Sequence, residues 1–267
     1  MQFIKNIFLF IMLTCSIISC ADSGDPIINE TKGWSVQKLY QTALDALSNG
    51  SYDRAIKLYN ALETTYPYGV YAQQGLLDLS YAYYENDKPE LALATVDQFI
   101  ITYPTNTSMD YALYLKGYIN FLPDDGFFAK LTKQNQSQLD QLGLQEAYKA
   151  FNELVNKYPT SKYAPDSRLK INEIVNDLAL SELYKARYYM SIKAYLAAIN
   201  RSQIIITTYM DSHQIEEAIA IEVSAYKLLG QLQLSDDTKK VLAVNYPKSK
   251  YLRHDWKYNS SSWYSLF

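Results

Sequence analysis

Residues 52–67 read YDRAIKLYNALETTYP, and this stretch contains the pattern that decides the fold. Its apolar positions recur at intervals of three and four residues, which is the period of an amphipathic helix, and the charged side chains fall on the other face. A proline cannot continue a helix, so Pro67 marks the end of this one. The stretch therefore predicts a helix that packs along one side and stops at a Tyr-Pro pair.

The same spacing recurs along the chain: an alanine, a larger residue four positions on, and Tyr-Pro eleven and twelve positions on. The copies are Ala55, Tyr59, Tyr66-Pro67; Ala92, Val96, Tyr103-Pro104; Ala147, Phe151, Tyr158-Pro159; a weaker Ala198, Ser202, Tyr209-Met210; and a remnant, Tyr246-Pro247. Alanine allows two helices to cross closely, and internal repeats of this length indicate stacked helix pairs. We therefore expect an all-α fold, a tetratricopeptide-like (TPR-like) superhelical solenoid of about five helix pairs.

The repeats divide the chain into two predicted halves. Residues 34–160 carry repeats 1–3, and residues 161–252 carry repeats 4 and 5. Within the first half, residues 122–140 have no apolar period and are rich in Gln, Asn and Ser, which is typical of an inserted loop. Residues 253–267 form an aromatic tail, which we expect to cap the last repeat.

The N-terminus has the pattern of a lipoprotein signal. An apolar run over residues 7–18 is too short to span a bilayer but suits a signal-peptide core. It ends in Ile17-Ile18-Ser19-Cys20, which resembles the bacterial lipobox, so residues 1–19 are interpreted as a lipoprotein signal peptide and Cys20 as the lipidation site. Residues 20–33 would then be the acylated N-terminus and a tether. The alternatives are a chance cysteine after an ordinary cleavage site, or an uncleaved anchor.

The location within the envelope follows from the residue after the cysteine. In Gram-negative lipoproteins an aspartate there usually means retention in the inner membrane, and this chain has Ala21. The lipobox resemblance therefore implies an outer-membrane protein, held by its acyl chains.

Composition argues against several other classes of function. The net charge is −3 and there is no basic block, so a nucleic-acid partner is not expected. The two histidines, His213 and His254, are isolated, so no metal site is predicted, and no nucleotide-binding or nucleophile motif occurs. We therefore expect no cofactor and no enzymatic activity; an enzyme such as a peptidoglycan hydrolase would need conspicuous Glu or Ser-Lys sites.

A binding groove is predicted on the first helices of the repeats, because these line the inner face of TPR solenoids. The candidate residues for a peptide or substrate groove are Tyr40, Gln74, Tyr81, Tyr84, Tyr111, Tyr114, Tyr118 and Phe121. The last four recur at i, i+3, i+7 and i+10 on a helix expected over residues 108–121. The alternative is that this aromatic stripe is simply core. Tyrosine offers a large, rigid contact area, which suits peptide binding.

The ordered motifs resemble those of the BamD (ComL-type) lipoproteins of the outer-membrane β-barrel assembly machinery. The matching stretches are Leu39-Tyr40-x-x-Ala43-x-x-Ala46-Leu47, Tyr81-Ala82-Tyr83-Tyr84, Asp110-Tyr111-Ala112-x-Tyr114-x-x-Gly117, Tyr158-Pro159-x-Ser161-x-Tyr163-Ala164-x-Asp166 and Tyr195-x-Ala197-Ala198-x-x-Arg201. The likeness covers about residues 20–252. The chain departs from it in lacking an arginine-rich run at residues 136–141 and a proline at Met210.

The resemblance implies a non-enzymatic scaffold, lipid-anchored in the outer membrane and facing the periplasm. Its implied partners are a BamA-type POTRA barrel protein, small Bam lipoproteins and unfolded outer-membrane barrel substrates. The implied partner-binding residues are Arg168, Arg187, Tyr188 and Arg201, which could instead serve in helix capping and packing. The aromatic tail could also mimic the terminal strand of a barrel substrate. The alternative function is a TPR lipoprotein of pilus or secretin assembly or of cell-envelope division.

Overall fold

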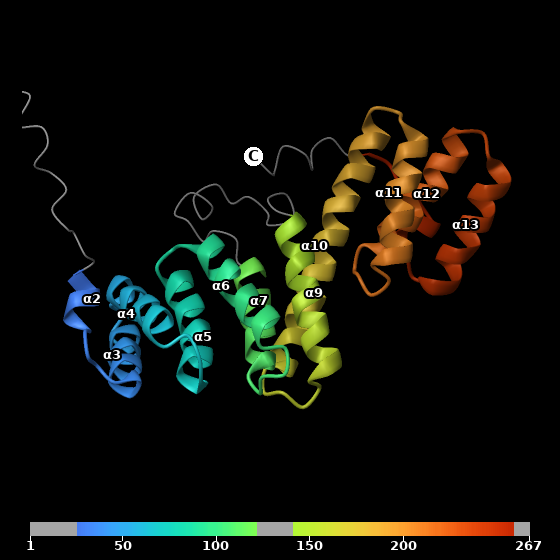
Figure 1. Ribbon diagram of the computed structural model, residues 1–267. Helices are drawn as coiled ribbons and strands as arrows, with labels where there is room; N and C mark the ends of the chain where they lie inside the picture. The colour runs from blue at the N-terminus through green and yellow to red at the C-terminus, as the bar shows by residue number, and fades with distance from the viewer. Residues whose placement is uncertain (1–25, 122–140, 259–267) are drawn as a thin grey trace, which may run out of the picture. The chain divides into compact units, whose positions relative to one another are not determined.

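The structure is a computed structural model that describes residues 26–121 and 141–258 (Figure 1). These residues contain α-helices, one short 3-10 helix and no strand. The helices are α2 (Pro26–Glu30), α3 (Val36–Ser48), α4 (Tyr52–Thr65), α5 (Val70–Glu85), α6 (Pro89–Thr102), α7 (Met109–Phe121), α9 (Gln141–Lys157), α10 (Ala164–Ser191), α11 (Tyr195–Thr208), α12 (Ile215–Leu228), α13 (Leu232–Asn245) and the 3-10 helix η3 (Lys250–Leu252). The expected all-α, TPR-like arrangement of helix pairs is confirmed for the described residues.

The repeated alanine and its larger partner lie inside the helix pairs, as the spacing predicts. Ala55, Ala92, Ala147 and Ala198 are all fully buried, and so are the residues four positions on, from Tyr59 to the weaker copy at Ser202. The small side chain lets neighbouring helices approach, while the larger one fills the space one turn further along. The motif therefore marks where each second helix packs against its neighbours.

The Tyr-Pro pairs lie where the second helices end. The backbone N–H of Tyr66, Tyr158, Tyr209 and Tyr246 each closes the last helical turn, at 2.8–3.0 Å from the carbonyl four residues earlier. After Tyr158, Tyr209 and Tyr246 the chain makes the same tight turn, in which the backbone N–H three residues on donates to the tyrosine carbonyl; for example, Ser212 N donates to the Tyr209 carbonyl at 3.0 Å. Met210 is therefore compatible with the turn, because the backbone hydrogen bonds form without a proline.

The chain forms two compact units, Met1–Phe99 and Ile100–Phe267. In the first, α3 packs on α4 and α4 on α5, and Ser80 on α5 donates to the Ala92 carbonyl on α6 at 2.8 Å. The boundary between the two compact units thus lies inside α6. The boundary at residue 160 between the two halves expected from the repeats stays a prediction.

The described part of the predicted tether is packed against the first unit. Residues 26–30 form α2, which contacts α4, and Ile27 is buried. Glu30 pairs with Arg54 on α4 at 2.6 Å. The prediction of a tether over residues 20–33 is therefore wrong for residues 26–33. There, the buried side chain of Ile27 and the ion pair of Glu30 hold the segment against the first unit. The predicted signal peptide, Cys20 and the insertion at 122–140 lie outside the described residues.

In the second unit each helix packs on the next from α9 to α13, and α7 packs on α9 (Figure 1). The contact between α7 and α9 is close because Gly117 faces the ring of Phe151; a Cβ added at Gly117 would lie 2.6 Å from that ring. After η3 the chain returns to α12, where Trp256 is buried in the same apolar cluster as Ala218 and Ile221. The described part of the tail thus packs on α12 through Trp256, its role as a cap for the last repeat stays a prediction, and residues 259–267 lie outside the described residues.

Candidate functional site

In the first unit, two of the predicted groove residues converge on a carboxylate. The Tyr40 hydroxyl on α3 donates to Asp78 Oδ2 at 2.9 Å, and Gln74 on α5 donates to Asp78 Oδ1 at 3.0 Å. Tyr59 adds a third hydrogen bond, to Oδ2 at 3.3 Å. Burial raises the pKa of Asp78, and these three hydrogen bonds only partly offset it. Asp78 thus holds together three helices of the first unit.

The surroundings of Asp78 are aromatic. The ring of Tyr40 lies 5.2 Å from that of Tyr71 and 6.2 Å from that of Tyr59, measured between centroids. Asp78 makes no salt bridge with any of the described basic residues. A carboxylate held by neutral donors between aromatic rings can accept further hydrogen bonds or a cationic group from a peptide. Tyr81, 37% exposed, and the partly buried Tyr84 continue along α5.

In the second unit, the aromatic stripe on α7 is divided between core and surface. Phe121 is 4% exposed and packs edge-on against Phe151, so it belongs to the core. Tyr111, Tyr114 and Tyr118 are half-buried. Tyr114 donates to Asp166 on α10 at 2.8 Å and stacks on Tyr163 at 4.8 Å. Tyr118 stacks on Tyr114 at 6.0 Å. Phe121 thus fits the interpretation of the stripe as core, whereas the three tyrosines are partly accessible. The role of the stripe as a peptide groove stays a prediction.

The predicted partner-binding residues differ in how far their charges are satisfied within the chain. Arg187 on α10 makes two 2.7 Å hydrogen bonds to Glu217 on α12, and Arg201 on α11 donates to Glu182 on α10 at 3.0 Å. Tyr188 is 47% exposed. Arg168 is exposed and makes no salt bridge with the described residues. Of the four, Arg168 and Tyr188 are therefore the more available for a partner.

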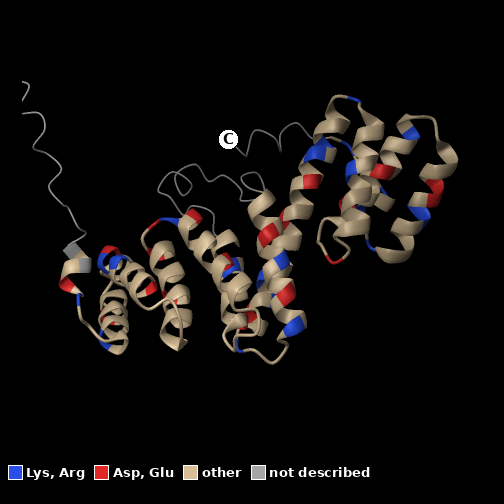
Figure 2. Ribbon diagram, in the orientation of Figure 1, with Lys and Arg blue, Asp and Glu red and all other residues tan. Residues whose placement is uncertain are grey.

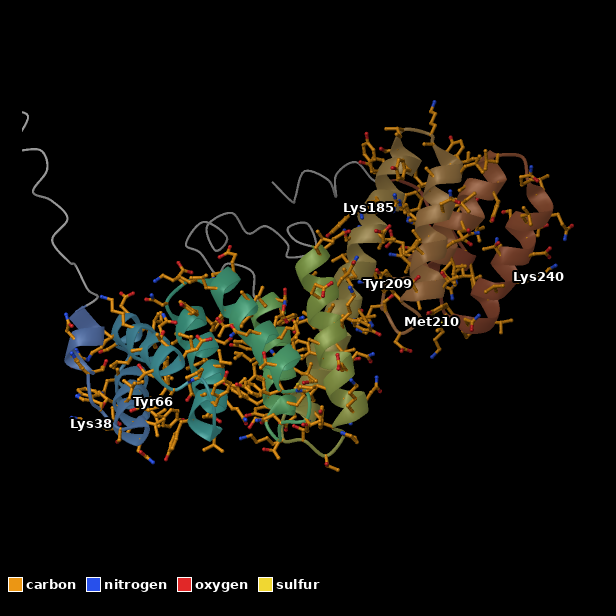
Figure 3. All side chains as sticks on the ribbon, viewed as in Figure 1. Lys38, Tyr66, Lys185, Tyr209, Met210 and Lys240 are labelled. Atoms are coloured by element: carbon orange, nitrogen blue, oxygen red, sulfur yellow. The ribbon has the colours of Figure 1, made fainter. Side chains whose placement is uncertain are left out.

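Acidic residues buried between helices were missed by sequence reasoning. Glu182 is buried and pairs with Lys185 at 2.7 Å as well as with Arg201; Lys185 and the nearby Tyr209 are labelled in Figure 3. Basic and acidic residues are interspersed along α10 (Figure 2). Glu222 stands inside the apolar run AIAIEVSAY of α12. A charged residue within such a run is a signal that could have identified Glu222. For Glu182, helical spacing could have suggested the i+3 partner Lys185, whereas Arg201 lies on the next helix and depends on the fold.

Glu222 is buried on α12 without a charged partner. It is 6% exposed, and its Oε1 atom has no hydrogen-bond partner among the described residues. Burial alone raises its pKa from 4.5 to about 7. An isolated ionised carboxylate is unfavourable in an apolar site, so the folded protein keeps the proton to higher pH than the unfolded chain does.

The free energy of unfolding is expected to depend on pH through Glu222. Between pH 4.5 and about 7 the folded state retains a proton that the unfolded state releases, so stability falls as pH rises through this window. The total loss is about 3 kcal/mol, since one pKa unit corresponds to about 1.4 kcal/mol. Glu222→Gln is expected to recover most of it at pH 8. Urea unfolding at pH 5, 6.5 and 8 measures the effect, with Glu153→Gln, at an exposed position, as control. If the stability of Glu222→Gln depends on pH as steeply as that of the wild type, the prediction is contradicted.

Two features are absent from residues 26–121 and 141–258. None of the described helices combines the length and the apolar composition of a membrane-spanning segment. No group of three or more His, Cys, Asp or Glu residues in those parts of the chain is arranged to hold a metal ion.

The stacked helix pairs define a helical-repeat protein of the TPR type. A family model, YfiO, described as "Outer membrane lipoprotein", matches residues 33–242. "Outer membrane protein assembly factor BamD" of Neisseria meningitidis serogroup A is 42% identical over 262 residues, which cover 97% of this chain and 98% of the relative. The protein of the same name from Vibrio cholerae is 35% identical over 229 residues, 86% of this chain and 93% of the relative. The chain belongs to the BamD family of outer-membrane protein assembly factors.

Among solved structures, the MamA protein resembles the chain only loosely. Its TM-score is 0.36 and its sequence identity 16%, over 83% of this chain and 96% of that one. A likeness of this strength does not bear on function.

Proposed function

We propose that this chain is a non-enzymatic scaffold lipoprotein of the outer-membrane β-barrel assembly machinery. It is anchored in the outer membrane through acylated Cys20, faces the periplasm, and supports the folding and insertion of barrel proteins. The observation that carries the proposal is identity of 42% to a BamD protein over nearly the full length of both chains. Stacked helix pairs fit this role, because such repeats present extended binding surfaces.

Two surfaces of the scaffold have different partners in this proposal. Unfolded barrel substrates bind the inner helices of the first unit, where Tyr40, Gln74 and Asp78 are linked by hydrogen bonds and Tyr81 is exposed. The BamA-type POTRA barrel and the small Bam lipoproteins bind near Arg168 and Tyr188 on α10, which are exposed. Arg187 and Arg201 hold α10 against its neighbours and shape that surface.

A depletion experiment tests the assembly role. Loss of the protein is expected to lower the amount of folded barrel proteins in the outer membrane and to leave inner-membrane proteins unchanged. Wild-type chain should restore them, and Cys20→Ser should restore them poorly because the acyl anchor is lost. Unchanged barrel levels after depletion, or co-purification of a secretin in place of a POTRA barrel, would rule the proposal out.

The groove is tested by removing one exposed ring. Tyr81→Ala is expected to weaken binding of a peptide copied from the last strand of a barrel protein by about five- to thirtyfold, since truncating an aromatic contact typically costs about 1–2 kcal/mol of binding free energy. Fluorescence anisotropy measures the affinity. Tyr148→Ala on α9 is the matched control, because Tyr148 is 36% exposed against 37% for Tyr81 and lies outside the predicted groove. Equal loss in both variants would count against a groove at Tyr81.

A further inference from the structure

The C-terminal segment completes a pocket in the second unit, where α10 ends, α11 begins and α12 ends. Its volume is about 400 Å³, within the range of ligand and side-chain pockets. The floor is apolar and largely buried: Met190 is 7% exposed and Trp256 8%. Leu228 and Tyr258 also line it but are 57% and 38% exposed, so they stand at its mouth. The pocket is thus open to solvent with a buried apolar base.

The wall contributed by Trp256 is fixed by hydrogen bonds. Its indole N–H donates to Glu217 Oε1 at 3.0 Å, and its carbonyl accepts from the Ser224 hydroxyl at 3.2 Å. Glu217 is held in turn by Arg187. A wall held this way does not need to reorganise when the pocket is filled, and preformed pockets lose less conformational entropy on binding.

The rim of the pocket is basic although the chain as a whole is acidic. Lys193, Lys227 and Lys257 line the pocket together with one acid, Asp255. Lys227 pairs with Asp255 at 2.6 Å, while Lys193 and Lys257 form no salt bridge with the described residues. Three bases against one acid leave an excess of two positive charges around the apolar base, in a chain whose net charge is −3.

We propose that this pocket docks an acidic segment of a partner protein, which inserts one aromatic or branched apolar side chain over Trp256 and Met190 and places Asp or Glu residues beside Lys193 and Lys257. The exposed mouth favours an anchor residue on a larger partner over a small enclosed ligand. Excess positive charge at the rim selects acidic neighbours of that residue and speeds their encounter. The proposal rests on the proposed function only in that the occupant is a protein partner; the binding test below can fail while the assembly role stands.

The first test selects peptides from a random display library on the mature, full-length chain. The selection is repeated on the pocket variant Leu228→Glu, which places a negative charge at the mouth and changes a side chain that is mostly exposed. Peptides recovered on the wild type and lost on Leu228→Glu are expected to share an apolar residue flanked by Asp or Glu. The proposal is overturned if the recovered peptides have basic residues beside the apolar one. It is also overturned if no recovered peptide binds the wild type better than Leu228→Glu.

Charge removal provides the second test, with a recovered peptide as the probe. Lys193→Asn combined with Lys257→Asn is expected to weaken binding about three- to thirtyfold, and the wild-type affinity should fall as salt increases. Asparagine suits position 193, whose φ is 62°. Lys248→Asn is the matched control, because Lys248 is exposed and does not line the pocket. An equal effect of the control overturns the proposal.

Two other occupants are outcomes of the same measurement. Residues 259–267, NSSSWYSLF, follow directly on Tyr258. If peptides bind only to a full-length variant with Trp263→Ser and Phe267→Ser, the chain's own tail is the occupant and the partner proposal is wrong. If dodecanoate binds the pocket and no peptide competes with it, the site takes a fatty acid, which also overturns the proposal.

Discussion

Phe151→Ala is expected to lower the free energy of unfolding by about 3–5 kcal/mol, because it removes a fully buried ring and leaves a cavity. The ring lies at the centre of the packing between α7 and α9. It contacts Tyr114 at 6.0 Å and Phe121 at 6.5 Å between centroids, and α7 approaches it through Gly117. Urea unfolding followed by circular dichroism measures the loss.

The same contact predicts a rescue. A Cβ at Gly117 would meet three atoms of the Phe151 ring at 2.6–2.8 Å, so Gly117→Ala forces a shift in a well-packed ring and costs about 1–3 kcal/mol despite the better helix propensity of alanine. Phe151→Leu replaces the ring by a smaller side chain and so makes room for a Cβ at position 117. In the Phe151→Leu background, Gly117→Ala should therefore lower the free energy of unfolding by less than it does in the wild type. An additive double variant would contradict this account.

Gly75 provides the matched control for Gly117. A Cβ there would meet Leu62 Cδ2 at 2.8 Å, which is the end of a flexible side chain that can rotate away. Gly75→Ala is therefore expected to be near neutral, since the gain in helix propensity offsets a small repacking. Equal destabilisation at both glycines would show that helix–helix distance, and not the rigid ring, sets the cost.

The fold could be predicted from the sequence because its determinants are local and repeated. The alanine at each crossing, the larger residue one turn on and the tyrosine at each helix end recur at fixed spacing, and the structure buries or caps each of them. The docked helix α2 was missed, because residues 26–30 include proline and polar residues that read as a tether. Its stability depends on Ile27 and on Glu30 reaching Arg54, a contact remote in sequence.

The candidate site was only partly predictable, since it depends on which faces of the helices meet. Helical spacing placed Tyr40 and Gln74 on one surface but gave no sign of Asp78, which looks like an ordinary polar residue of an amphipathic helix until α3, α4 and α5 pack around it. Likewise Phe121 shares a stripe with Tyr114, yet only the position of Phe151 decides that it is buried. The C-terminal pocket needs Trp256 to fold back on α12, which no periodicity encodes.

Arg187→Ala is expected to destabilise the second unit by about 3 kcal/mol and to loosen residues 249–258. The side chains of Arg187 and Glu217 are 29% and 20% exposed, so removing one partner leaves the other charge largely desolvated. Burial alone would raise the pKa of Glu217, but hydrogen bonds from Arg187 and Trp256 outweigh it and hold that pKa below its usual value. Without Arg187 the Glu217 carboxylate also loses the two hydrogen bonds that position it to accept from the Trp256 indole.

The measurement is urea unfolding together with amide hydrogen exchange of residues 249–258, which should quicken in Arg187→Ala before any change in the first unit. Arg187→Ala combined with Glu217→Ala should cost less than the sum of the single changes, because no unpaired charge remains. Lys240→Ala is the control, since its pair with Asp237 on α13 is exposed and should have no measurable effect (Figure 3). In a shared network, Glu217 links Arg187 to Trp256, so losing Arg187 must be felt at Trp256. If the two single losses in stability add and hydrogen exchange at Trp256 is unchanged, the ion pair does not hold the C-terminal segment.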